Sequence, residues 1–231
     1  MSKAQAWTTD DADALPDRVL AELEATEVER GRPLIAVDAD EVLVHFAEHF
    51  RDWCVGRGLR FELVEYRLDN ALRHADGTAL TREEITPLIW EFIETQTRWQ
   101  RPIDGAAAAL HRLSEAAQIV VLTNAPAKVR EDRVANLADL AMPWPVVMNE
   151  GGKGRALKWL VERADAPVAF IDDSVAQHAS AAKHAPEVLR FHMVLPELLK
   201  PVIGEAEGAH ARLHGWGEAT SAIAKALAND G

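Results

Sequence analysis

Short apolar runs alternate with amphipathic segments along most of the chain. Five runs have the length and apolar character of buried strands, at residues 34–37, 118–123, 144–149, 167–173 and 187–194. Apolar residues recur at helical spacing in residues 102–117, 126–140, 152–164, 175–185 and 217–227. Strands that alternate with helices are typical of a parallel sheet covered on both faces. The pattern therefore predicts an α/β fold.

Two segments depart from this alternation. Residues 1–30 form an N-terminal extension, in which we expect a mobile lead-in over 1–15 and a helix over 16–30 that ends before Gly31. Residues 45–101 contain two amphipathic helices, 45–58 and 81–100, with no convincing strand between them. Thr81 and Glu84 have the spacing of a capping box. We therefore predict a helical insertion, 45–101, within a core formed by residues 31–44 and 102–231.

The composition limits the classes of partner. The 231 residues are 48% hydrophobic, which is enough for one substantial core, and the net charge of -12 disfavours nucleic acid polymers and anionic membranes as general partners. A small phosphorylated metabolite is still allowed, because its binding depends on local charge. No apolar run approaches the roughly 20 residues that span a bilayer, and the N-terminus lacks a signal-peptide pattern. With a single cysteine, Cys54, this predicts a cytoplasmic protein; the oligomeric state is not predicted.

Polar residues follow three of the predicted strands at the point where each ends. Asp38 comes after the first strand, Thr123 ends the second, and Asp172 and Asp173 end the strand at 167–173. In open α/β sheets, ligands bind beyond the carboxyl ends of the strands. We therefore expect these side chains to meet at one site. Lys153, flanked by glycines at the start of a predicted helix, could lie at the same edge.

The clustered acids indicate a particular chemistry. Four carboxylates in one pocket repel each other, and a divalent cation removes the conflict. Oxygen ligands from strand ends suit Mg²⁺, which bridges to substrate phosphate. A carboxylate can also be a nucleophile, and a second carboxylate two positions later can transfer protons. The hydroxyl of Thr123 with the backbone amide of Asn124 can hold phosphate oxygens, and Lys153 supplies a positive charge.

The order of these motifs resembles the haloacid dehalogenase-like hydrolases. The four family motifs are similar to "IAVDADEV", "IVVLTN", "GGKGRAL" and "VAFIDDS", in the family's order. The resemblance covers roughly residue 34 to the C-terminus. It implies a Rossmann-like core, a helical cap inserted between the first two motifs, and a Mg²⁺-dependent phosphohydrolase.

The resemblance also implies a role for each matching residue. Asp38 is the nucleophile and Asp40 the general acid and base. Lys153 positions the phosphate and the nucleophile, and Thr123 and Asn124 bind phosphate. The implied metal ligands are Asp38, the backbone carbonyl of Asp40, Asp172 and Asp173.

Several alternatives are open at this stage. Lys158 rivals Lys153 but should point to solvent, and His45, Phe46 and His49 either face the site or pack within the insertion. Glu41 occupies a position where the family often has glycine, which leaves the backbone geometry of the turn after Asp38 open. The predicted activity is a phosphatase with an aspartyl-phosphate intermediate. The alternatives are a nucleotidase-like specificity, a phosphomutase, a metal-independent 2-haloacid dehalogenase, and a non-catalytic module that binds phosphate or metal.

Overall fold

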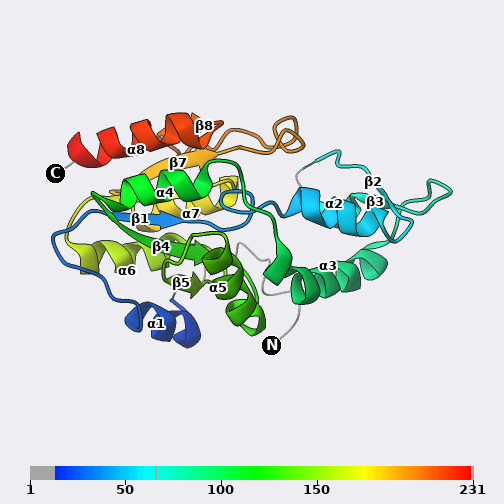
Figure 1. The fold of residues 1–231 in the computed structure, drawn as a ribbon, viewed down its shortest axis with the longest axis horizontal. Helices are drawn as coiled ribbons and strands as arrows, with labels where there is room; N and C mark the ends of the chain where they lie inside the picture. Colours follow the sequence, from blue (N-terminus) through cyan, green and yellow to red (C-terminus); the bar gives the residue numbers. More distant parts are fainter. Residues whose placement is uncertain (1–13, 66, 230–231) are drawn as a thin grey trace.

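The sheet predicted from the sequence is present in the computed structural model, which describes residues 14–65 and 67–229 (Figure 1). Its neighbouring strands are all parallel, in the order β5-β4-β1-β6-β7-β8. They are β1 (Leu34–Val37), β4 (Gln118–Thr123), β5 (Val146–Met148), β6 (Val168–Asp172), β7 (Leu189–Met193) and β8 (Ala211–Leu213). The α/β prediction is confirmed. Strand β8 was not predicted, because three residues with Arg212 in the middle form no apolar run. The predicted lead-in lies almost entirely outside the described residues.

The central strand β1 is buried on both faces. Successive side chains of a strand point to opposite faces, so Leu34 and Ala36 enter one hydrophobic cluster while Ile35 and Val37 enter the other. Helices α4 (Ala106–Ser114) and α8 (Trp216–Asn229) cover the face of Ile35, and α6 (Gly154–Ala164) and α7 (Val175–His184) cover the other. Helix α5 (Arg130–Asp139) packs beside β5. Because the strands are parallel, their carboxyl ends all lie along the same edge of the sheet.

The N-terminal helix α1 (Asp17–Glu24) is part of the core. It packs against α6 and β5, and the carboxylate of Glu22 accepts a hydrogen bond from the backbone N–H of Met148 in β5 at 2.7 Å. The helix is shorter than the predicted range 16–30, because the chain must become extended before it enters β1. Val28, which was expected on the helix, lies in the loop that leads to β1. There it packs against the hydrophobic cluster that contains Leu34. Helix α1 therefore covers the edge of the sheet.

The segment that follows β1 and precedes α4 forms a separate layer beyond the strand ends (Figure 1). It contains α2 (Ala47–Val55), β2 (Arg60–Phe61), the 3-10 helix η2 (Leu68–Asn70), β3 (Leu72–Arg73), α3 (Arg82–Gln96) and η3 (Thr97–Trp99). The expectation that it contains no strand was wrong, since β2 and β3 pair antiparallel. Two-residue strands are too short to produce a periodic pattern. The capping box of Thr81 and Glu84 is present at the start of α3. The domain boundaries stay a prediction.

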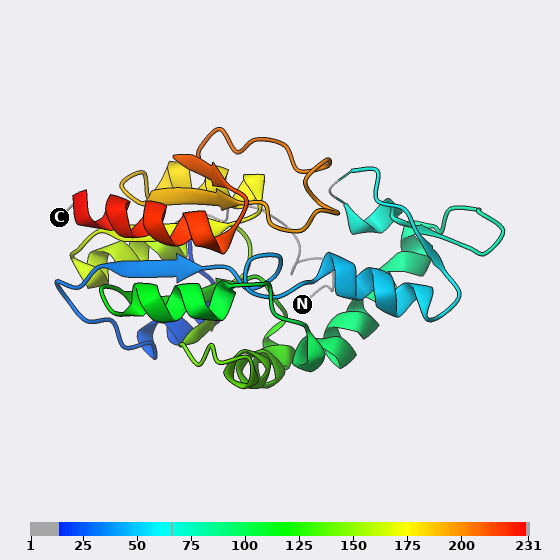
Figure 2. The same ribbon diagram turned by 45° about the horizontal axis from the view of Figure 1, so that its top comes forward.

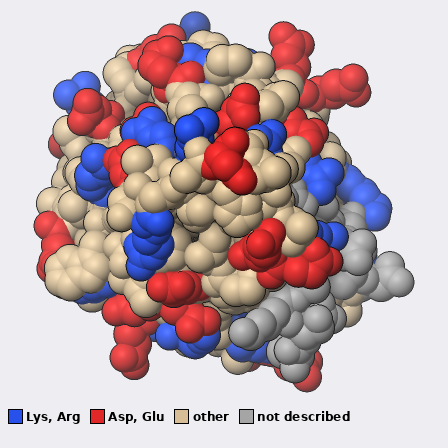
Figure 3. All heavy atoms as spheres, turned by 90° about the vertical axis from the view of Figure 1, so that its right-hand side faces the viewer, with Lys and Arg blue, Asp and Glu red and all other residues tan. Residues whose placement is uncertain are grey.

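A long connection between β7 and β8 joins the two layers. Figure 2 shows residues 194–210 extending from the sheet to the insertion, where Leu199 and Ile203 form a small apolar cluster with Ala47 of α2. Figure 3 shows the face that carries the insertion, on which acidic and basic side chains are interspersed. None of the helices in the described ranges combines the length and the apolar character needed to cross a bilayer.

Candidate active site

Polar side chains from four distant segments meet at the carboxyl edge of the sheet. Asp38 follows β1, Thr123 ends β4 and Asp172 ends β6, and these strands are neighbours in the order β4-β1-β6. Lys153 lies at the N-cap of α6. The predicted motif residues therefore lie together, at the position where open α/β sheets bind ligands.

The ammonium group of Lys153 bridges two of the acids. Its Nζ lies 2.7 Å from Oδ1 of Asp38 and 2.6 Å from Oδ2 of Asp172, and the residue is only 1% exposed. Burial opposes the charged form of Lys153, but Asp172 and Asp38 hold its pKa above the ordinary value. Lys153 therefore stays charged and partly balances the acids. Burial raises the pKa of Asp38; Lys153 opposes this rise and Asp172 adds to it.

Close packing fixes the start of α6 and thereby the position of Lys153. The backbone N–H of Lys153 donates to Oε1 of Gln177 in α7 at 2.7 Å, and that of Gly154 donates to the hydroxyl of Ser180 at 3.0 Å. A Cβ at Gly154 would lie 2.1 Å from the carbonyl oxygen of Ser180. Only glycine allows this approach of the two helices, which explains one of the glycines beside the motif lysine.

Three buried carboxylates could hold a metal ion. Oxygen atoms of Asp38, Asp172 and Asp173 all lie within 4.8 Å of one another. One ammonium cannot balance three carboxylates, and donors that are all oxygen suit a hard divalent cation such as Mg²⁺. These residues fit the implied metal. The carboxylate of Asp40 is not part of this group, and the contribution of its backbone carbonyl stays a prediction.

The residues expected to bind phosphate lie beside Asp38 and Lys153. The Thr123 hydroxyl is buried and has no hydrogen-bond partner among the described residues, so it is available to a ligand. The side-chain amide of Asn124 donates to the carbonyl of Gly151 at 2.7 Å and accepts from Asn149 at 2.9 Å, which leaves its backbone N–H out of these contacts. In this arrangement Asn124 positions the loop that leads to Lys153. Its role in binding phosphate stays a prediction.

The carboxylate of Asp40 is held by two residues that the sequence interpretation did not identify. Nη2 of Arg133 donates to Oδ1 of Asp40 at 2.6 Å, and Nε2 of Gln100 donates to the same oxygen at 3.3 Å. Burial raises the pKa of Asp40, and Arg133 opposes this rise. A signal for Arg133 was present, because it lies four residues after Val129 and four before Leu137, on the buried face of a predicted helix.

A small pocket lies between Asp40 and the insertion. It is lined by Asp40, Phe46, Ile93, Thr97, Asn124, Ala125, Pro126 and Arg133. Residues of both layers form its wall. Phe46 therefore faces the candidate site, which the sequence interpretation left open.

Glu41 connects the turn after Asp38 to the insertion. Its φ of 63° lies in the left-handed region, which explains why glycine is favoured at this position. The side chain is buried, and its carboxylate accepts a hydrogen bond from the backbone N–H of Ala47 at the start of α2, a helix without a side-chain cap of its own. Burial raises the pKa of Glu41 to about 8. The turn accommodates a glutamate, which anchors α2.

Two histidines form hydrogen bonds with the backbone of Asp172 and Asp173. Nε2 of His178 donates to the carbonyl of Asp172 at 3.0 Å, and Nε2 of His192 donates to that of Asp173 at 2.9 Å. Burial lowers the pKa of both histidines to about 4, so both are neutral at pH 7. Both are fully buried and fix the backbone of the predicted metal ligands.

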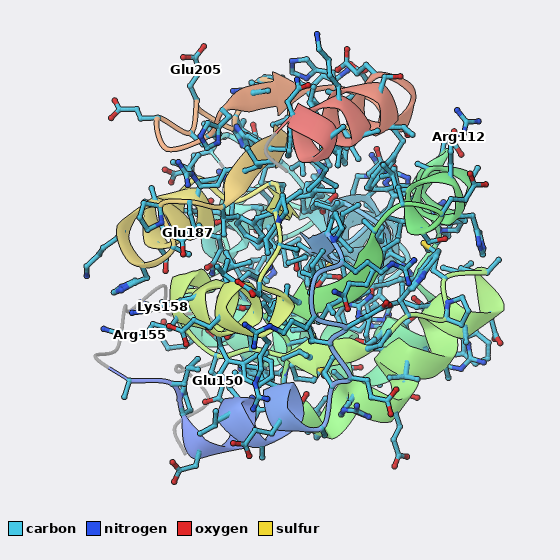
Figure 4. All side chains as sticks on the ribbon, turned by 90° about the vertical axis from the view of Figure 1, so that its left-hand side faces the viewer. Arg112, Glu150, Arg155, Lys158, Glu187 and Glu205 are labelled. Atoms are coloured by element: carbon cyan, nitrogen blue, oxygen red, sulfur yellow. The ribbon has the colours of Figure 1, made fainter. Side chains whose placement is uncertain are left out.

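The remaining candidates lie away from the acids. Lys158, the rival of Lys153, is exposed and points outward from α6 (Figure 4). Nδ1 of His45 lies 3.6 Å from the carboxylate of Glu48. The ring of His49 packs edge-on against Phe92, with the centroids 5.3 Å apart. Neither histidine lines the pocket. Lys153 is therefore the lysine of the site.

Comparisons with known proteins find similar structures only. No family model and no curated protein matches the chain. A Thermotoga maritima protein assigned as a β-phosphoglucomutase is 18% identical, with a TM-score of 0.56 over 85% of this chain and 100% of that chain. A haloacid dehalogenase-like hydrolase assigned in Burkholderia xenovorans is 14% identical, with a TM-score of 0.58 over 84% and 97%. CbbY from Rhodobacter sphaeroides, in complex with phosphate, is 16% identical, with a TM-score of 0.53 over 80% and 95%. At such identities these likenesses establish the fold, which confirms the resemblance at that level.

Proposed function

We propose that this chain, which has the fold of the haloacid dehalogenase-like hydrolases, is a Mg²⁺-dependent phosphatase that acts on a small phosphomonoester. The observation that carries the proposal is the buried cluster in which Lys153 contacts Asp38 and Asp172 while Asp173 lies beside them. A divalent cation would balance the acids that Lys153 leaves uncompensated. Lys153 and the free hydroxyl of Thr123 are groups that bind phosphate oxygens.

The reaction begins with the carboxylate of Asp38. One of its oxygens attacks phosphorus, the bond from phosphorus to the leaving oxygen breaks, and Asp40 gives its proton to that oxygen. Asp38 then carries the phosphoryl group as an aspartyl-phosphate. In the second half Asp40 takes a proton from water, the water oxygen attacks phosphorus, and the bond from phosphorus to the Asp38 oxygen breaks. Inorganic phosphate leaves and Asp38 is regenerated.

The other residues hold the reacting groups in place. Mg²⁺, bound by Asp38, Asp172 and Asp173, would supply positive charge toward the phosphate oxygens. Lys153 keeps the nucleophilic carboxylate in a fixed position through its 2.7 Å contact with Oδ1 of Asp38. The insertion covers the pocket beside Asp40 and excludes water from the leaving group.

Hydrolysis of an aryl phosphate tests the proposal. The wild-type protein should hydrolyse p-nitrophenyl phosphate with added Mg²⁺ and lose this activity in excess chelator. Asp38→Asn removes the nucleophile and should lower kcat by at least about a thousandfold. Asp104→Asn, at an exposed position, is the matched control and should behave like the wild type. Full activity of Asp38→Asn or of the chelated protein would contradict the proposal.

A phosphomutase is the second candidate, because the fold is shared with a protein assigned as a β-phosphoglucomutase. A mutase would need a bisphosphate to phosphorylate Asp38 and would return the phosphoryl group to a sugar. Phosphate release without a bisphosphate would favour the phosphatase. A 2-haloacid dehalogenase would use Asp38 but would leave Asp40 and Asp173 without a role; halide release without metal would support it. A nucleotidase-like specificity, the class of metabolite and the cytoplasmic location stay predictions.

A further inference from the structure

The guanidinium group of Arg133 has a hydrogen-bond partner on one side only. Its Nη2 donates to Asp40 at 2.6 Å, whereas Nε and Nη1 have no partner within the described part of the chain. The residue is 1% exposed, so solvent does not surround these donors. Buried donors without partners are costly, and more so in a charged group. Arg133 is therefore a cation with unused donors in the wall of the pocket.

The pocket beside Arg133 lies on the leaving-group side of the site. In the proposed reaction Asp40 must contact the oxygen that leaves phosphorus, whereas Lys153 serves the transferred phosphoryl group beside Asp38 and Asp172. Arg133 contacts Asp40 and lines the pocket that continues to the insertion. The part of the substrate beyond its phosphate therefore extends toward Arg133.

The other groups that line the pocket do not compete with Arg133 for a polar ligand. Four of them are apolar: Phe46, Ile93, Ala125 and Pro126. The hydroxyl of Thr97 donates to the carbonyl of Ile93 at 2.7 Å, and the side-chain amide of Asn124 donates to the carbonyl of Gly151. A guanidinium group only donates hydrogen bonds, and it prefers carboxylates and phosphates. The unused donors of Arg133 thus select an anion.

We propose that Arg133 binds a second anionic group of the substrate, either a carboxylate or a second phosphate, on the leaving-group side. This inference rests on the proposed phosphatase function. Nη2 of Arg133 lies 2.6 Å from the carboxylate of Asp40, which must contact the leaving oxygen, so an anion bound by the other donors of Arg133 lies close to that oxygen. The two anionic groups are therefore joined by a short carbon chain. The substrate class is a short phosphorylated hydroxy acid or a short bisphosphate.

Matched pairs of substrates test this assignment. One pair is 3-phosphoglycerate and glycerol 3-phosphate, which differ by a carboxylate; the other is 1,3-propanediol bisphosphate and its monophosphate. In the wild type, kcat/KM for the doubly anionic member of at least one pair should exceed that of its partner by about 10- to 100-fold. Arg133→Met should reduce this ratio to about one, and Arg133→Lys should keep part of it. Arg130→Met, on the same helix but with a side chain 47% exposed, should leave the ratio unchanged.

The ratio separates recognition from general damage, because a merely destabilised site loses activity toward both members of a pair equally. Equal ratios in the wild type and Arg133→Met would overturn the proposal while leaving the phosphatase function intact.

If the wild type hydrolyses no phosphoester, the proposed function fails. Ligand binding then tests the anion subsite beside Arg133. Stabilisation of the protein by glycerate but not by glycerol, lost in Arg133→Met, would support the subsite. No difference between glycerate and glycerol, together with no difference between 1,3-propanediol bisphosphate and its monophosphate, would overturn it.

Discussion

Substitution of Glu41 by glutamine tests whether the buried carboxyl in the turn after Asp38 keeps its proton in the folded protein at neutral pH. The pKa of Glu41 is about 8 instead of the ordinary 4.5, because burial disfavours the charged form. The unfolded chain loses this proton near pH 4.5, whereas the folded chain keeps it to about pH 8. The unfolded state therefore binds fewer protons across this window, and the free energy of unfolding falls as the pH rises through it.

The size of the effect follows from the shift in pKa. One unit corresponds to about 1.4 kcal/mol, and pH 7 lies about 2.5 units above the unfolded pKa, so Glu41 lowers the free energy of unfolding by on the order of 3 kcal/mol at this pH. Glutamine keeps an oxygen that can accept from the N–H of Ala47 but does not titrate. The stability of Glu41→Gln relative to the wild type should therefore increase from pH 5 to pH 8 by about this amount.

Urea unfolding followed by circular dichroism at pH 5, 6, 7 and 8 measures this difference. The change with pH is informative, because the absolute stability also includes the buried Oε2, which has no partner among the described residues. Glu83→Gln, at an exposed position of the insertion, leaves the buried carboxyl and its neighbours in place and should retain the wild-type pH dependence. A constant difference between Glu41→Gln and the wild type across this range would refute the reasoning.

Three further substitutions test the charge and packing of the site and the insertion. Lys153→Met leaves two buried carboxylates without a cation and should cost about 3–5 kcal/mol of stability in chelator, with partial recovery in Mg²⁺; unchanged urea unfolding in chelator would contradict this. Gly154→Ala places a Cβ 2.1 Å from a carbonyl oxygen of Ser180 and should cost about 1–3 kcal/mol or more, so a wild-type Tm in calorimetry would argue against the close contact. Thr81→Ala removes the cap of α3 and should cost about 1 kcal/mol, measured as faster hydrogen exchange in its first turn, whereas unchanged exchange would show that the capping box does not stabilise the helix.

The least predictable parts of the fold were those with short or exposed strands. Strands β2, β3 and β8 have two or three residues each, too few for a periodic pattern, and their pairing depends on neighbours that are distant in sequence. Helix α1 was predicted, but not that it covers β5, since an amphipathic pattern identifies a buried face and not its partner. Nor did the sequence predict that residues 194–210 pack against the insertion.

The sequence by itself determined the α/β alternation and the positions of the acids after the strands. Both follow from local rules: buried strands are apolar throughout, and parallel strands end on one side of the sheet. Only the tertiary structure paired Arg133 with Asp40, 93 positions away, and brought His178 behind Asp172. It also directed Glu41 to the start of α2. Such contacts depend on how helices pack over the sheet and which rotamers that packing allows, which no local pattern encodes. The residues expected to carry the chemistry were thus readable from the sequence, whereas those that orient them became visible only in the folded chain.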